Sequence, residues 1–172
     1  LTSFVGGGGR LITSGSQAAR WIQEEGGTSA RALLALLGVT WSGEGQGPAR
    51  LVPTGALASV GPFELGGATD AGSSGADTFD VIRARARATS VIQVDAGSAA
   101  VSVPGQSVFF SFPLESVPAG AFRTALLDAA LSIVLGTEDV ATTVVASPSA
   151  VVLRGGRAEA TFRSIGDGDL VG

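Results

Sequence analysis

The sequence predicts an α/β fold in which a mainly parallel sheet is flanked by helices, of the flavodoxin or Rossmann type. The first observation is a strand–turn–helix pattern: an apolar strand at residues 10–13, a turn at 14–16 and a helix-forming run after it. The second is residues 107–112, the most strongly β-forming and apolar run, which is typical of a central strand. A helical pattern follows it at residues 118–135.

The N-terminal elements follow from local signals. Residues 1–9 are typical of a last helical turn that ends in glycines, so we expect an earlier strand and helix of the fold to precede them. Ser16 is a suitable N-cap for a helix over residues 17–25. A second helix, apolar on most faces, is expected over residues 30–37, and Gly38 ends it.

The middle and the end of the chain are richer in turn residues. Residues 42–75 predict an irregular loop or insertion, with weak strands at 49–52 and 57–60. Strands are expected at 79–83, 89–94 and 99–103. After residue 136, short β runs predict the start of an immunoglobulin-like module or a linker. We therefore expect a partial α/β domain over 1–136 and a β-rich segment over 137–172.

Composition excludes several classes of function. The chain has 172 residues, is 45% hydrophobic and carries a net charge of −4, with 11 basic residues that are all arginine. A buried core is therefore expected. We expect neither nucleic acid as a partner nor insertion into a membrane. Cysteine and histidine are absent. Only carboxylates and hydroxyls remain as catalytic groups, and we expect neither a cofactor nor a metal.

Three features carry a family resemblance: the glycine-led run at residues 7–15, Gln17, and Phe-Ser-Phe-Pro-Leu-Glu-Ser at residues 110–116. The first resembles the run into the nucleophile elbow of class I glutamine amidotransferase-like domains. Gln17 stands where the C-x-G-x-Q pattern of that family has its glutamine, and the third feature is similar to its F-H-P-E-S. The likeness is to degenerate versions in large secreted bacterial proteins, including peptidases and cell-wall amidases.

The resemblance implies that catalysis has been lost. It places the family's nucleophilic cysteine on Thr13, its elbow glycine on Gly15 and its base histidine on Pro113, and only the acidic member remains, as Glu115. Amide hydrolysis of this kind needs a thiolate, a base and an orienting carboxylate. The implied protein is a pseudoenzyme: an accessory or interaction domain of a larger secreted or cell-surface bacterial protein, with the cytoplasm not excluded. Its expected partners are other domains of the same longer chain, and protein or glycan at the cell surface.

Two other functions are considered beside this one. A hydrolase or transferase would use Thr13 or Ser14 with Glu115, and a structural segment of a surface filament or stalk would use only its outer faces. Thr13 and Glu115 are expected to approach each other at the carboxyl ends of neighbouring strands. Four binding candidates lie near a helix N-terminus, where N–H groups hold anions: Ser14, Gly15, Ser16 and Gln17. The fifth is Glu115, either a remnant of the family's site or an acid in a loop or in the first turn of the last helix.

Other polar and aromatic residues have plainer interpretations. Asp70, Asp77 and Asp80 lie in a predicted polar loop, and their carboxylates are of the type that binds calcium. Their spacing matches no known calcium loop, so they are predicted to be solvated turn residues. Trp21 and Trp41 are predicted to be packing residues.

Overall fold

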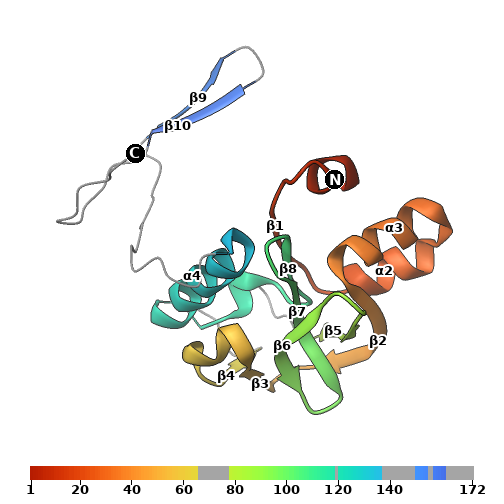
Figure 1. Ribbon diagram of the computed structural model, residues 1–172. Coiled ribbons are helices and arrows are strands. Elements are labelled where there is room, and N and C mark those ends of the chain that lie inside the picture. The colour runs from red at the N-terminus through yellow and green to blue at the C-terminus, as the bar shows by residue number, and fades with distance from the viewer. Residues whose placement is uncertain (66–77, 119, 137–149, 155–156, 162–172) are drawn as a thin grey trace. The chain divides into compact units, whose positions relative to one another are not determined.

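The computed structural model describes residues 1–65, 78–118, 120–136, 150–154 and 157–161 (Figure 1). The chain divides into two compact units, Leu1–Glu138 and Asp139–Gly172. In the second unit, β9 (Ala150–Arg154) and β10 (Arg157–Thr161) form an antiparallel pair. Whether this unit begins an immunoglobulin-like module stays a prediction.

The first unit is built on an eight-stranded sheet. Its strands are β1 (Leu11–Ser14), β2 (Val39–Gln46), β3 (Ala49–Pro53), β4 (Phe63–Leu65), β5 (Thr78–Ala84), β6 (Thr89–Val94), β7 (Gly97–Val103) and β8 (Ser107–Phe110). Hydrogen-bonded neighbours follow the order β1-β8-β7-β6-β3-β4, and β5 joins β7 to β2. Strands β1 and β8 are parallel, whereas every other described pair in this sheet is antiparallel.

The predicted fold class is therefore wrong. The sheet is mixed and mostly antiparallel, it is curled into a half-barrel, and few helices accompany it. The physical reason lies in the connections, because a parallel crossover needs a dozen or more residues whereas an antiparallel hairpin needs very few. Only residues 95–96 separate β6 from β7, and only residues 104–106 separate β7 from β8. These strands pair antiparallel with each other.

The region predicted to be irregular is largely regular where the structure describes it. Residues 42–65 contribute to β2, β3 and β4, and the weak strand expected at 57–60 is part of a 3₁₀ helix, η1 (Gly55–Val60). The long strand β2 pairs with β5 from Val39 opposite Ala84 to Gln46 opposite Thr78. This segment belongs to the sheet and is not an insertion into it.

The helices are close to their predicted positions. They are α1 (Thr2–Gly6), α2 (Ala18–Glu25), α3 (Gly27–Leu37) and α4 (Ala121–Leu135), with a 3₁₀ turn, η3 (Leu114–Ser116), after β8. Gly38 ends α3 with a φ of 71°, and a Cβ there would lie 2.5 Å from the Cβ of Ala88 and 2.9 Å from Val103. Only glycine permits this close turn into β2. No helix among the described residues is long and apolar enough to cross a membrane.

Two hydrophobic clusters lie on opposite faces of the sheet. Helices α2 and α3 cover one face and α4 covers the other, with β1 and β8 between them (Figure 1). All four residues of β8 are buried. Phe109 belongs to the α2/α3 cluster, whose other buried members are Ala19, Leu34, Leu37, Val39, Ile82 and Val101. Phe110 belongs to the larger α4 cluster, which includes Phe112 and Leu126, Ala130 and Val134 of α4. The prediction of a buried central strand near residues 107–112 is confirmed. The α2/α3 face is the one that positions the site described next.

Candidate functional site at the start of helix α2

The turn between β1 and α2 has an unusual backbone at Gln17. This residue is the N-cap of α2 and has φ 60° and ψ 5°, the left-handed conformation that few residues other than glycine adopt. Its side chain makes no capping hydrogen bond. Ser16 is exposed and is not the N-cap, so the prediction that Ser16 caps this helix is wrong.

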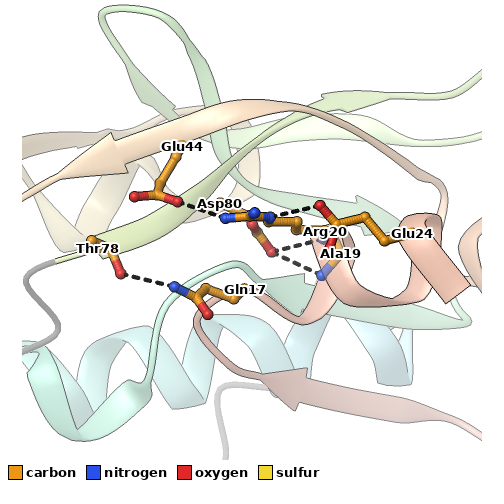
Figure 2. A network of polar contacts seen from close by, with 7 residues as sticks. All are labelled: Gln17, Ala19, Arg20, Glu24, Glu44, Thr78 and Asp80. Carbon is orange, nitrogen blue, oxygen red and sulfur yellow. Dashed lines mark hydrogen bonds and ion pairs between the residues drawn. The ribbon is translucent and has the colours of Figure 1, made fainter.

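Asp80, on β5, supplies the cap instead. Its Oδ2 accepts hydrogen bonds from the backbone N–H of Ala19 at 2.8 Å and of Arg20 at 3.2 Å (Figure 2). The first N–H groups of a helix have no partner within the helix, and a carboxylate there also interacts favourably with the helix dipole. Asp80 is fully buried. A carboxylate far away in the sequence thus fixes the start of α2 against the sheet.

Burial is the largest influence on the Asp80 carboxyl, and it raises the pKa above its ordinary value. The N–H groups of Arg20 and Ala19, the indole of Trp41 and the charge of Arg20 oppose this rise. Asp80 Oδ1 and Trp41 Nε1 are both buried, and neither has a hydrogen-bond partner within the described part of the chain. The indole therefore favours the carboxylate through proximity and not through a well-formed hydrogen bond.

The side chain of Arg20 is partly exposed and lies on the solvent side of the buried Asp80 carboxylate. Its guanidinium pairs with Glu24 at 2.9 Å and with Glu44 at 3.1 Å (Figure 2). It also lies 5.9 Å from the ring centroid of Trp41. Exposed pairs of this kind contribute little to stability, because water and salt screen them. The side-chain amide of Gln17 donates a long hydrogen bond of 3.5 Å to Thr78 Oγ1. The site is thus a polar network that joins α2, β2 and β5.

The residues predicted to form an active or binding site are only partly brought together. Thr13 and Ser14 lie half-buried on β1, in register with Phe109 and Phe110 of β8. Gly15, Ser16 and Gln17 follow in the turn to α2. Glu115 lies in η3, directly after Pro113 and Leu114, and its side chain is exposed. Strands β1 and β8 are parallel neighbours, but no hydrogen bond joins Glu115 to Thr13 or Ser14.

Asp80 and Trp21 have surroundings that differ from those predicted from the sequence. The strand expected at 79–83 includes Asp80, but its carboxylate was predicted to be solvated, whereas it is fully buried within β5. The signal was present, because Asp80 lies in the apolar run Phe79-Asp-Val-Ile82, where a carboxylate needs polar partners. Trp21 is 67% exposed and is not a core residue, whereas Trp41 packs against the α2/α3 cluster. Asp70 and Asp77 lie outside the described residues.

Within the described ranges, no group of three or more acidic side chains is placed to hold an ion.

Comparison with protein-family models and with curated proteins finds no match to this chain. The geometry around Asp80 and the β1–α2 turn is therefore the basis for assigning a function.

The raised pKa of Asp80 makes a prediction about pH. The unfolded chain has a pKa near 3.8 at this residue, so between that pH and the higher folded-state value the folded chain binds more protons. The free energy of unfolding, taken relative to that of Asp80→Asn, should therefore fall as pH rises through this window and stay constant above it. Urea titrations of both proteins from acidic to neutral pH measure this difference. An advantage of the native chain that grows with rising pH would contradict the prediction.

Proposed function

We propose that this chain is a non-catalytic accessory or interaction domain of a larger secreted or cell-surface bacterial protein. The observation that carries the non-catalytic part is the position of Asp80. Its carboxylate occupies the N–H groups of Ala19 and Arg20 at the start of α2, and its negative charge lies where an anionic intermediate or ligand would bind. N–H groups that already bind a carboxylate do not stabilise a second anion.

The hydroxyls beside this helix also lack activation. Thr13 and Ser14 have no histidine or cysteine to work with, since the chain contains neither. Glu115 is exposed and makes no hydrogen bond to either hydroxyl. A hydroxyl without a base stays protonated and is a weak nucleophile. This arrangement supports a scaffold for interaction over the hydrolase or transferase alternative.

The secreted or cell-surface setting has a separate support. It rests on the resemblance of residues 7–17 and 110–116 to degenerate amidotransferase-like domains of large bacterial proteins. The expected partners are other domains of the same longer chain, and protein or glycan at the cell surface.

Activity measurements on the pure chain test the proposal. Hydrolysis of glutamine and of p-nitrophenyl esters should be no faster than with Thr13→Ala, Ser14→Ala or Glu115→Gln. A fluorophosphonate probe should leave the mass of the intact chain unchanged. Turnover that Thr13→Ala or Ser14→Ala abolishes would overturn the proposal, as would a covalent adduct mapped to either hydroxyl.

A further inference from the structure

Strand β1 ends the sheet, yet its surroundings are those of an internal strand. Among the described strands it pairs only with β8, so its other side is an open edge. Leu11 packs against the α2/α3 cluster on one face, and Ile12 packs against the α4 cluster on the other. A strand with helices over both faces is normally found inside a sheet and not at its border.

The backbone of β1 presents unused hydrogen-bonding groups at this edge. The N–H of Leu11 donates to Gln106 and the N–H of Gly15 donates to Phe110, both on the β8 side. Successive residues of a strand direct their backbone groups to opposite sides, so Thr13 also faces β8. The N–H and C=O groups of Ile12 and Ser14 therefore face the open edge. No residue that the structure describes bonds to them.

The edge has few of the usual protections against strand pairing. Natural edge strands are short or carry charges, prolines or bulges that prevent pairing with another chain. Strand β1 is short, with four residues, but it contains no charge, proline or bulge, and all four residues are partly exposed. Phe4, which is 57% exposed, lies with its ring against Gly9, just before β1 begins. Both the backbone and the neighbouring surface thus suit an apolar, extended segment.

We propose that the open edge of β1 binds an extended apolar strand of another polypeptide, which continues the sheet beside β1. This inference deepens the proposed interaction function and rests on it. The donors and acceptors of Ile12 and Ser14 require an extended partner backbone. The clusters on both faces favour a continuous apolar run over one that alternates with polar residues. A second copy of β1 is a poorer partner, because the two-fold antiparallel register that pairs Ile12 with Ser14 would place the hydroxyl of Ser14 opposite the apolar Ile12.

Residue-resolved amide hydrogen exchange by NMR tests the edge directly. In the chain alone, the amides of Leu11, Thr13 and Gly15 should be protected, whereas those of Ile12 and Ser14 should exchange as fast as amides in exposed loops. Adding the peptide Lys-Lys-Val-Ile-Val-Ile-Lys-Lys should protect Ile12 and Ser14 in a saturable manner. The peptide Lys-Lys-Val-Asp-Val-Asp-Lys-Lys is the control and should protect neither amide.

Two proline variants form a matched pair. Ser14→Pro removes an N–H that faces the edge and leaves the bonds to β8, so it should fold and bind the apolar peptide about tenfold more weakly. Thr13→Pro removes an N–H that bonds to β8, so it should lower the stability of the free chain. If Ser14→Pro does not fold, the exchange pattern of the native chain still decides the question.

Three results would overturn the inference. The first is strong protection of Ile12 and Ser14 in the free chain at every concentration, because the edge would then already be covered. The second is protection that appears only with dimer formation, because the occupant would then be a second copy. The third is equal protection by both peptides, or by neither. None of these depends on hydrolytic activity, so failure of the edge inference and failure of the proposed non-catalytic function are distinguishable.

Discussion

Asp80→Ala should lower the free energy of unfolding of the first unit by about 2–4 kcal/mol. The substitution removes the acceptor of two backbone N–H groups at the start of α2, and both donors remain near the protein interior. It also removes a negative charge from the positive end of the helix dipole. Urea unfolding followed by circular dichroism measures the loss.

Two further variants separate capping from general effects of charge. Glu115→Ala alters an exposed carboxylate and should change stability by no more than about 0.5 kcal/mol. Asp80→Asn keeps one oxygen for the N–H groups of Ala19 and Arg20, so its loss should fall between those of the two alanine variants. The capping role of Asp80 is wrong if Asp80→Ala and Glu115→Ala have the same stability.

Local patterns predicted the elements that local interactions create. The helix after Ser16, the apolar helix before Gly38 and the buried strand β8 were all evident from spacing and composition. The order and direction of the strands were not evident, because pairing joins residues that are distant in the sequence. Strand β2 pairs with β5 across residues 47–77, for example, and no periodicity within either strand encodes that pairing.

Glycine explains why the sequence predicts an irregular loop over residues 42–46, the second half of β2. A strand is recognised from alternating apolar side chains, and Gly43 and Gly45 have none to contribute. The structure fills the gap from the neighbouring strand, because Phe79 of β5 lies opposite Gly45 and its ring occupies the space of the missing side chain. Phe79 is fully buried. An apolar side chain of β5 thus packs where β2 has only glycine.

The sequence predicts a site at the turn between β1 and α2, but it assigns the capping role to Ser16 and not to Asp80. The rule that serine before a helix caps it favoured Ser16, since such rules consider only neighbours in the sequence. The cap is Asp80, 61 residues from Ala19. Only the fold brings β5 to the start of α2, so no local rule identifies this cap.

The observed fold also gives less support to the family resemblance than the predicted fold did. A mainly parallel sheet was implied, and among the described strands only β1 and β8 are parallel. The first matched segment, residues 7–17, contains β1, and the second, residues 110–116, begins at the last residue of β8. The antiparallel strands β2 to β7 lie between the segments, in the middle of the chain, where no motif of the family is matched. The resemblance stays a prediction, and the proposed non-catalytic role rests on Asp80 independently of it.

Phe109→Ala and Phe110→Ala should each lower the free energy of unfolding by about 3–5 kcal/mol. Both side chains are at most 1% exposed, and they lie in different clusters on opposite faces of β8. Each substitution leaves a cavity that the sheet and its helices fill only in part. Phe122→Ala is the matched control, because Phe122 is 40% exposed on α4 and should lose far less. Similar losses at Phe122 and Phe110 would contradict the assigned core.

Double-mutant cycles then test whether the two clusters are separate. The rings of Phe110 and Phe112 lie 5.6 Å apart, centroid to centroid, within the α4 cluster, so these residues should be coupled by about 0.5–1.5 kcal/mol. Phe109 lies in the α2/α3 cluster, so its substitution should add to that of Phe112 within about 0.5 kcal/mol. Equal coupling in both cycles would mean that the two faces relax as one core. In that case the sheet would not divide the apolar side chains into two layers, and β1 would lose the two-sided environment on which its open edge depends.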